Sequence, residues 1–373
     1  MIKLDLKKFL FTTIAVGIGV VFVIYLFMDR EKLIQVIRVM EPKYLILAFS
    51  LQIVAVIGMM YRWKFVLDDT HIEVSRWKLL QITFSGISVA NLTPSARTGG
   101  EAARSYFLNK ETGCKSKDSL ATIIAERIFD LGFFVFIGIV AILISFFWFN
   151  LPLWIILLMI VLVAFTSIMV LLIFYTVTSE TFGLRFGMWL LNKFQRIVEK
   201  FEPLEKAQEK LKKDFREHSE NLRAYVNKKK LWVKAAGASG LMWTADVSRT
   251  YFVFLAIGIE VNPALLISLI FVSRAAGMVP ILPGGLGAIE GTRMIMISSA
   301  GIATEGAGVH TVVDRFFQFW VITIIGLIFS YYLGIKNYRE EEEVNKDKNQ
   351  KDKKQKREQS QEKPNKKTIK EKI

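Results

Sequence analysis

Long apolar runs dominate this sequence of 373 residues and constrain its fold more than any other feature. The runs that are largely free of charge are Phe9–Met28, Tyr44–Met60, Phe133–Phe149, Leu153–Tyr175 and most of Leu231–Ile259, Ala264–Ile281 and Phe316–Leu333. A helix of about 20 residues spans the roughly 30 Å hydrocarbon core of a bilayer. The number of such runs predicts an all-α polytopic membrane protein.

Basic residues are spread unevenly along the chain. The net charge of +15 would suit a nucleic-acid partner, but residues 176–230 hold 13 Lys or Arg and residues 336–373 hold 14, whereas the connections at 149–152, 258–263 and 299–310 hold none. Basic connections of multi-pass proteins stay on the cytoplasmic side. The pattern predicts a multi-pass protein of the cell membrane with N- and C-termini in the cytoplasm, and no nucleic-acid partner, although the connection after the first run is also basic.

The apolar runs divide into continuous and interrupted segments. Six full spans are expected at about 9–28, 44–67, 119–148, 153–176, 232–258 and 309–335. Two further segments, at 78–112 and 263–301, contain Pro and Gly, and irregular backbone at membrane depth is tolerated only inside protein or beside a water-filled cavity. We therefore expect two re-entrant broken-helix pairs.

Two segments outside these spans are polar. Residues 180–230 are predicted to form cytoplasmic amphipathic helices that lie at the membrane surface. Residues 336–373 form a tail rich in Lys, Glu and Gln, which is expected to be disordered and cytoplasmic. Residues 1–335 would then be one transmembrane domain.

The two halves of that domain, about 44–148 and 232–335, contain matching residues in the same order. The matches are Arg62 with Arg249, Pro94 with Pro283, Gly99–Gly100 with Gly284–Gly285, Glu101 with Glu290, Arg104 with Arg293, Glu126–Arg127 with Asp314–Arg315, and Gly138 with Gly326. Three crossings, an odd number, separate the first spans of the two halves. The pattern predicts an inverted repeat, an architecture of many transporters with substrate sites at the repeat interface.

The two Gly pairs indicate an anion site. Each is predicted to lie where a short helix starts after a Pro, so that backbone N–H groups and the helix dipole attract a group such as phosphate. Arg97 and Arg104 in one half, and Arg293 and Arg315 in the other, would add paired N–H donors. The alternative is that the glycines only permit close helix packing.

The carboxylates have competing interpretations. Glu101 completes a capping box with Thr98, so its role could be confined to its own helix. Glu290 has Gly287 at the equivalent position, so capping should not explain it, and a functional role is favoured. His310 and Asp314, four residues apart, would form either a proton relay or a simple hydrogen bond.

The candidate substrate-binding residues are Arg97, Gly99, Gly100, Glu101, Arg104, Glu126, Arg127, Gly284, Gly285, Glu290, Arg293, Asp314 and Arg315. No catalytic residue is predicted, because the sequence contains neither a P-loop nor a nucleophile motif. The three His residues are too far apart for a metal motif, and the single Cys114 excludes an intramolecular disulfide. We expect no cofactor.

Several motifs resemble the lysylphosphatidylglycerol synthase transmembrane (flippase-like) family over about residues 5–335. They are Asn91-Leu-Thr-Pro94, Arg97-Thr-Gly-Gly-Glu-Ala-Ala-Arg104, Glu126-Arg127-x-x-Asp130, Leu282-Pro-Gly-Gly-Leu-Gly-x-x-Glu290 and Arg315. The resemblance implies a membrane region that moves an aminoacylated or otherwise polar lipid between leaflets. Only about 38 residues follow the last predicted span, so aminoacyl transfer by a cytosolic synthase domain is not expected.

The combined patterns predict a lipid flippase-like transporter rather than an enzyme. Its partners would be membrane lipids with an anionic head group, such as an anionic phospholipid or a polyprenyl-phosphate-linked sugar. One alternative is a non-catalytic membrane subunit that presents lipid to a separate glycosyl- or aminoacyl-transferase. Another is a small-solute transporter.

Overall fold

The computed structural model describes residues 6–93, 98–148, 152–195, 199, 203–209, 212, 227–278 and 282–334. All regular secondary structure in these ranges is helical, as the apolar runs predict. Four stretches of helix are long and apolar enough to cross a membrane: Pro42–Leu67, Ser116–Phe147, Leu153–Thr176 and Thr304–Gly334. A fifth is obtained if the bent pair of helices near the N-terminus counts as one span.

The chain begins with two helices that meet at a sharp bend. The first helix, α1 (Leu6–Leu26), and the second, α2 (Arg30–Arg38), differ in direction by 109°. The Asp29 side chain starts α2 by accepting hydrogen bonds from the backbone N–H groups of Glu31 (2.9 Å) and Lys32 (3.1 Å). The basic connection after the first apolar run is therefore a short amphipathic helix.

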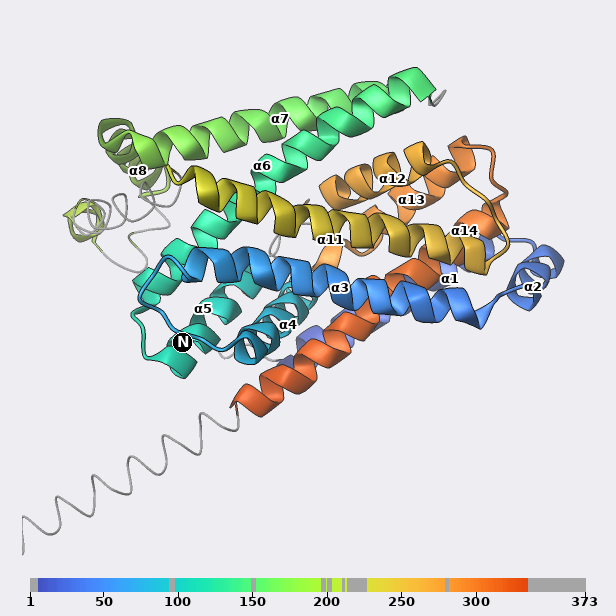
Figure 1. Cartoon of the computed structure of the whole chain (residues 1–373), viewed down its shortest axis with the longest axis horizontal. Coiled ribbons are helices and arrows are strands. Elements are labelled where there is room, and N and C mark those ends of the chain that lie inside the picture. Colours follow the sequence, from blue (N-terminus) through green and yellow to red (C-terminus); the bar gives the residue numbers. More distant parts are fainter. Residues whose placement is uncertain are drawn as a thin grey trace, which may run out of the picture. The chain divides into compact units, whose positions relative to one another are not determined.

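Two long helices, α3 (Pro42–Leu67) and α11 (Lys229–Ala256), lie side by side and antiparallel (Figure 1). At one end the backbone N–H of Glu41 donates to the carbonyl of Ala256 (2.9 Å), and at the other Lys228 Nζ lies 3.6 Å from Asp69 Oδ1. Helix α11 is not among the four most apolar spans, and it carries Asp246 and Arg249 as well as basic residues in its first turns.

Both interrupted segments form pairs of short helices. The first pair is α4 (Arg76–Leu92) and α5 (Thr98–Thr112), and the break at 94–97 lies outside the described residues. The second is α12 (Pro263–Ala276) and α13 (Ala288–Ser299), with a single 3-10 turn, η1 (Pro283–Gly285), between them. The helices of each pair pack against one another, and in Figure 1 the two pairs point inward from opposite ends of the bundle.

Three more helices complete the apolar body. They are α6 (Ser116–Trp148), α7 (Leu153–Thr178) and α14 (Thr304–Arg315), which continues through a wider π-helical turn, η2 (Phe316–Val321), and ordinary helix as far as residue 334. The main core joins α6, α11 and α12, where the Phe134 ring stacks on that of Phe271 at 4.7 Å and lies 6.1 Å from that of Trp243.

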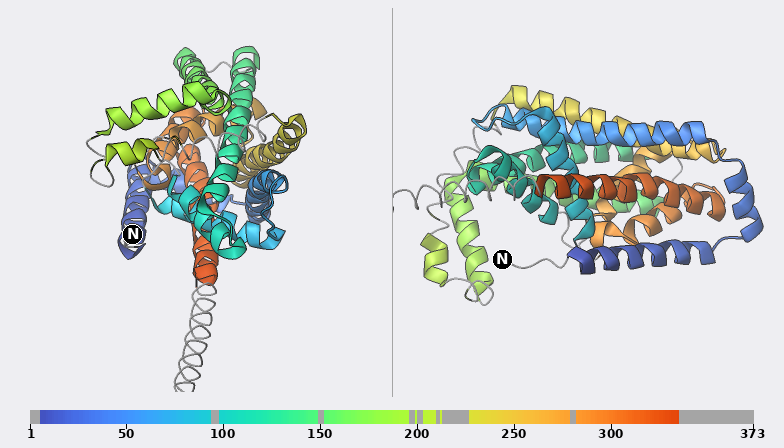
Figure 2. Two further views of the ribbon diagram at one scale, coloured as in Figure 1. Left: turned by 90° about the vertical axis from the view of Figure 1, so that its left-hand side faces the viewer. Right: turned by 90° about the horizontal axis from the view of Figure 1, so that it is seen from below.

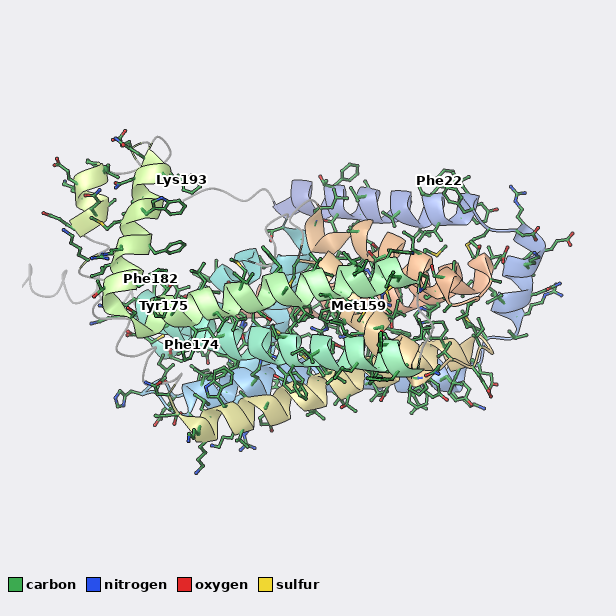
Figure 3. All side chains as sticks on the ribbon, turned by 90° about the horizontal axis from the view of Figure 1, so that it is seen from above. Phe22, Met159, Phe174, Tyr175, Phe182 and Lys193 are labelled. Carbon is green, nitrogen blue, oxygen red and sulfur yellow. The ribbon has the colours of Figure 1, made fainter. Side chains whose placement is uncertain are left out.

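The polar segments are described only in part. Helix α8 (Glu180–Lys193) falls within the predicted amphipathic segment and turns across the direction of α7, as both Figure 2 and Figure 3 show. Most of residues 194–226 and the tail at 336–373 lie outside the described residues. The chain separates into two units, Met1–Phe329 and Ser330–Ile373, and the described part of the second is the helix end at 330–334.

Two glycines at matching positions in the halves permit close helix contacts. A Cβ on Gly138 would overlap the side chains of Val163 and Phe271, and a Cβ on Gly326 would overlap the Phe84 carbonyl. A backbone carbonyl inside a packed helix cannot move away, so Gly326 allows the last span to approach α4. These glycines serve packing.

Replacing Gly326 by Val should lower the free energy of unfolding by roughly 1–3 kcal/mol, because the added atoms overpack the contact with α4. The matched control is Gly237→Val, since a Cβ on Gly237 meets nothing within 4 Å. Thermal unfolding of the detergent-purified variants measures the difference. Equal melting temperatures for both variants would contradict this account of the contact.

Candidate functional site

The first half of the chain buries an arginine–carboxylate network between α3, α5 and α6. Arg62 on α3 pairs with Glu126 on α6 (Nη2–Oε1, 2.6 Å) and with Asp130 (Nη1–Oδ1, 2.7 Å). Arg104 on α5 donates from Nη1 to the other carboxylate oxygen of Glu126 at 3.1 Å. Glu126 is fully buried, so one carboxylate joins two arginines from two other helices.

The second half contains an equivalent network between α11, α13 and α14. Arg249 on α11 donates from Nε to Asp314 on α14 at 2.8 Å, and Arg293 on α13 pairs with the second oxygen of the same carboxylate. Arg249 also pairs with Asp246 (2.7 Å). Asp314 is fully buried, as is Glu126 in the first half.

A third ion pair also occurs in both halves. Arg127 on α6 pairs with Glu101 on α5, and Arg315 on α14 pairs with Glu290 on α13, with Arg315 Nε 2.6 Å from Glu290 Oε1. Three ion pairs of the first half thus recur in the second between residues that match in sequence. A charge at the centre of a membrane helix costs roughly 2.5–3.5 kcal/mol by insertion scales, so pairing explains how so many charges are accommodated.

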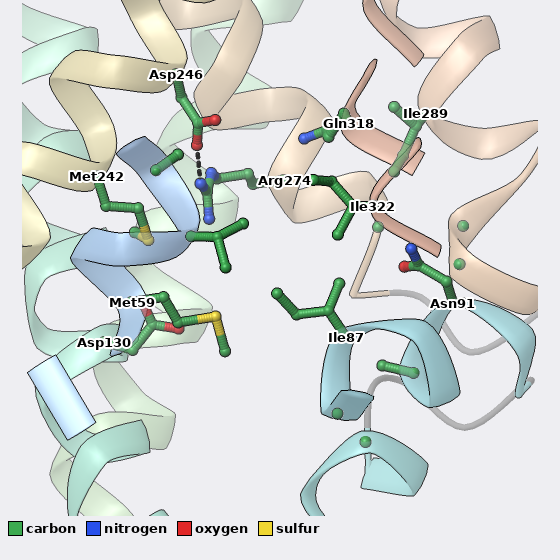
Figure 4. A pocket seen from close by; sticks show the side chains of 18 of the residues that line it. Met59, Ile87, Asn91, Asp130, Met242, Asp246, Arg274, Ile289, Gln318 and Ile322 are labelled. Atoms are coloured by element: carbon green, nitrogen blue, oxygen red, sulfur yellow. Dashed lines mark hydrogen bonds and ion pairs between the residues drawn. The ribbon is translucent and has the colours of Figure 1, made fainter. Parts of the chain in front are cut away.

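A cavity of about 140 Å³ lies where the two halves meet. Its walls come from α3, α4, α5 and α6 of the first half and from α11, α12, η1, α13, α14 and η2 of the second. Figure 4 shows Arg274 reaching across this space to Asp246, with Asn91 and Gln318 on the side of the helix breaks. The cavity has room for several water molecules or one compact polar group.

Charged side chains make up much of the cavity wall. Among the described residues, five arginines and three carboxylates line it: Arg62, Arg104, Arg127, Arg274, Arg315, Glu101, Asp130 and Asp246. The lining charges therefore have an excess of two positive charges. This environment favours an anionic ligand.

The structure brings together part of the predicted site. Of the thirteen candidates, those that line the cavity are Gly100, Glu101, Arg104, Arg127, Gly284, Gly285 and Arg315. Glu126, Glu290, Arg293 and Asp314 lie behind this wall as buried partners of other residues, and Gly99 does not line the cavity either. Arg97 lies outside the described residues.

The first Gly pair lies where the sequence predicts, and the second does not. Gly99 and Gly100 are in the first turn of α5, and Gly100 packs so closely on α4 that a Cβ would overlap the Gly86 carbonyl. Gly284 and Gly285 lie four and three residues before the first residue of α13 and have φ values of +56° and +68°. Only glycine adopts this backbone easily, so the second pair forms a turn rather than a helix start.

The prediction that capping cannot explain Glu290 is wrong. Its Oε2 accepts a hydrogen bond from the backbone N–H of Gly287 at 2.7 Å, which starts α13. This half of a capping box needs only a backbone N–H at the N-cap position, so a glycine there does not prevent it. Glu290 both caps α13 and binds Arg315, which in turn donates to the carbonyl of Gly284 at 3.1 Å.

His310 makes neither of the two interactions with Asp314 that its spacing suggested, a proton relay or a simple hydrogen bond, because its Nδ1 has no partner among the described residues. Its Nε2 lies 3.3 Å from the carbonyl oxygen of Thr250, and its ring stacks on that of Phe254 at 3.7 Å. The residue is fully buried and belongs to the contact between α11 and α14. The described residues contain no group of three or more His, Cys, Asp or Glu side chains that could hold a metal ion.

The sequence-based set of site residues lacks several members of the cavity wall. Arg274 on α12 is the most important of these, because it is charged and reaches into the cavity. In the sequence Arg274 can be recognised as a charge within an apolar run, but no residue of the first half matches it in the repeat. Gln52 and Gln318 line the cavity too, and a lone Gln in a span gives no sequence signal of its own.

Comparisons with known proteins agree with this architecture. Residues 11–326 match the family described as lysylphosphatidylglycerol synthase TM region. A UPF0104 membrane protein of Methanothermobacter thermautotrophicus is 27% identical over 321 residues, which are 86% of this chain and 94% of that protein. A UPF0104 membrane protein of Pyrococcus horikoshii is 29% identical over 327 residues, 86% of this chain and 96% of that protein.

A shorter match involves a larger protein. The phosphatidylglycerol lysyltransferase of Staphylococcus epidermidis is 27% identical over 104 residues, which are 28% of this chain and 12% of that protein. The family resemblance predicted from the motifs is therefore confirmed by the family match.

Replacing Asp314 by Asn should lower the free energy of unfolding by roughly 3–5 kcal/mol, because Arg249 and Arg293 would lose their shared buried counter-charge. The matched control is Asp68→Asn, which removes a half-exposed partner of Lys64 and should cost less than about 1 kcal/mol. Thermal unfolding in detergent compares the two. Similar losses in both variants would show that the buried network does not stabilise the fold.

Proposed function

The chain belongs to the lysylphosphatidylglycerol synthase TM region family, and from this premise we propose that it is a lipid flippase-like transporter. It moves a lipid with an anionic or phosphate-linked polar head group between the two leaflets. It performs no chemical reaction itself. The candidate residues that line the cavity contact the head group, and those behind the wall hold them in place.

The observation that carries this proposal is the charged cavity between the two halves. Five arginines and three carboxylates face a space in a molecule whose outer helices are apolar. Large apolar side chains such as Phe165, Leu171 and Phe146 are exposed on α6 and α7, where they suit contact with lipid tails. A lipid needs both environments at once, since its head group is polar and its chains are not.

The arrangement of the two halves supports alternating access to this cavity. We propose that the chain has six full spans and two re-entrant pairs, and that residues 44–148 and 232–335, which hold four of the spans and both pairs, are an inverted repeat. The antiparallel α3 and α11, the three recurring ion pairs and the inward-pointing helix pairs at opposite ends support it. In such architectures the substrate site lies at the repeat interface.

The arginine side chains have a direct role in this function. Arg127 is a quarter exposed and is held by Glu101 and Asp130, so a head group can reach it by displacing a carboxylate. In the empty state the carboxylates keep the arginines paired. A phosphate group that binds would accept the charge-assisted hydrogen bonds that the arginines donate to the carboxylates in the empty state.

The relatives favour lipid over other substrates. The phosphatidylglycerol lysyltransferase is named for a phospholipid substrate, and the family that this chain matches is described as a lysylphosphatidylglycerol synthase TM region. We extend to this chain only the lipid class, an anionic phospholipid or a polyprenyl-phosphate-linked head group. Lysyl transfer is not part of the proposal.

We also propose that the protein lies in the cell membrane with its basic end in the cytoplasm. Helix α8 would lie at that surface, because a row of aromatic rings continues along it from the end of α7. The Tyr175 ring lies 4.7 Å from that of Phe182, the Phe182 ring stacks on that of Phe186 (6.1 Å), and the Phe186 ring stacks on that of Trp189 (5.8 Å). Lys193 lies over the Trp189 ring at 4.7 Å, at the level expected for lipid head groups.

The transport activity is testable in liposomes that contain fluorescently labelled lipids and are exposed to a membrane-impermeant quencher. The wild-type chain should allow quenching beyond the outer-leaflet fraction for a labelled phosphatidylglycerol or a short polyprenyl phosphate. Arg127→Gln should slow this by about tenfold or more, because a charge-assisted bond to the head group is lost. Arg38→Gln, at an exposed position on α2, is the matched control.

The outcomes separate the candidate functions. Excess quenching that Arg127→Gln reduces and Arg38→Gln does not supports lipid translocation. If the folded wild-type chain allows no excess quenching with any lipid, the proposal fails. A subunit that presents lipid to a separate transferase, or a small-solute transporter, would then be the better hypothesis.

The native Cys114 tests the orientation. It lies in the connection between α5 and α6, at the end that we assign to the cytoplasm, and it is partly exposed. A membrane-impermeant maleimide should label it only after cells are permeabilised. In a Cys114→Ser background, Glu260→Cys, at an exposed position between α11 and α12, should be labelled in intact cells. The reverse labelling pattern would invert the proposed topology.

A further inference from the structure

One arginine that borders the cavity keeps a complete hydrogen-bonding edge unused. Arg104 donates from Nη1 to Glu126, while its Nε and Nη2 have no partner among the described residues. The side chain is only 2% exposed, so water does not satisfy these donors freely. Unpaired buried N–H groups cost free energy, which a bound acceptor would recover.

The geometry of that edge selects the ligand. Nε and Nη2 lie on the same side of the planar guanidinium, and their two parallel N–H bonds match two oxygens of a phosphate group. The guanidinium lies over the Trp63 ring, with its carbon 4.0 Å from the ring centre, and its aliphatic part packs on Gly86. The contacts with the Trp63 ring and with Gly86 hold the guanidinium in one position, so the direction of its Nε–Nη2 edge is fixed before a ligand binds.

A second arginine with an unused donor comes from the other half. Arg274 on α12 pairs through Nη2 with Asp246, and its Nε has no partner in the described part of the chain. It also lies over a tryptophan, Trp243, at 4.7 Å. Arg293, which matches Arg104 in sequence, does not line the cavity. Of the two second-half arginines that do, Arg315 and Arg274, it is Arg274 that has a buried donor without a partner among the described residues.

The charge of the surrounding network favours an anion at this place. The buried and half-buried network of the described residues contains seven arginines and six carboxylates: Arg62, Arg104, Arg127, Arg249, Arg274, Arg293, Arg315, Glu101, Glu126, Asp130, Asp246, Glu290 and Asp314. One positive charge therefore lacks a counter-charge in this set. A buried excess charge is costly unless an ion of opposite sign accompanies it.

We propose that the Nε–Nη2 edge of Arg104 and the Nε of Arg274 form a phosphoryl-binding subsite that joins the two halves of the chain. The subsite deepens the proposed function and rests on it: the ligand group is the phosphate of the transported lipid. The shared chemistry is a phosphoryl oxyanion, which a lipid head group or free phosphate can supply. Arg104 gives two parallel donors and Arg274 gives one from the opposite half.

Equilibrium binding of radiolabelled inorganic phosphate to the detergent-purified full chain tests the subsite. Arg104→Lys keeps the charge but loses the paired donors, and should weaken binding by about tenfold, the equivalent of one charge-assisted hydrogen bond. Arg274→Gln should weaken it by a similar factor. Arg30→Gln, exposed on α2, should bind phosphate as the wild type does.

The Lys variant also separates binding from structure. A role limited to neutralising Glu126 would be preserved by Lys, so wild-type phosphate affinity in a folded Arg104→Lys protein would overturn the proposal. Unchanged elution volume and melting temperature establish that the variant is folded. No phosphate binding by the wild-type chain would overturn the proposal as well.

A competition arm identifies the source of the phosphoryl group. A short-chain phosphatidylglycerol should displace the labelled phosphate at lower concentrations than glycerophosphoglycerol, its head group without chains. If the lipid does not displace phosphate better than the soluble head group, the lipid assignment of the subsite is overturned. Liposome transport is measured separately. If the Arg104→Lys variant transports lipid at the wild-type rate, the subsite alone is rejected. If the wild-type chain binds phosphate but transports no lipid, the proposed function alone is rejected.

Discussion

The structure depends on two buried carboxylates, Glu126 and Asp314, each of which holds two arginines from two other helices. In each half the carboxylate lies on a long span, one arginine lies on the first span, and the other lies on a short helix of the broken pair. The short helices α5 and α13 have only 15 and 12 residues. Helices of this length are too short to cross a bilayer, so hydrophobicity alone does not fix their place in the bundle. Their arginines must stay beside the carboxylates, since an unpaired charge in that environment is costly.

This constraint also creates the cavity. The glycines Gly86 and Gly100 bring α4 and α5 into close contact. The positive φ angles of Gly284 and Gly285 turn the chain back beside the end of α4. The end of α4 and the turn η1 therefore meet beside the cavity, where arginines that are not fully paired line the same space. A rigid network behind the wall and a charged space in front of it are what a polar head group needs.

The comparisons differ in how much of each relative's length they cover. The UPF0104 relatives are matched over at least 94% of their length in the two cases described, whereas the lysyltransferase is matched over 12% of its own. The family that residues 11–326 match is described as a TM region, so the features of this region are the ones to consider. The buried network and the cavity are the features of this chain that carry polar chemistry into an apolar body.

The sequence by itself determined that the chain is all-helical and membrane-embedded, that two segments are broken, and which arginines and carboxylates belong together as a set. These properties follow from local composition: apolar runs near 20 residues, Pro and Gly within such runs, and charges too costly to leave unpaired. The tertiary structure alone decided which charge pairs with which, because one carboxylate can accept from several arginines and the choice depends on helix packing. It also decided that Glu290 caps α13, since that hydrogen bond needs only a backbone N–H, and that Arg274 rather than Arg293 faces the cavity. A side chain's direction depends on how its helix is rotated against its neighbours, and that rotation is a property of the packed molecule.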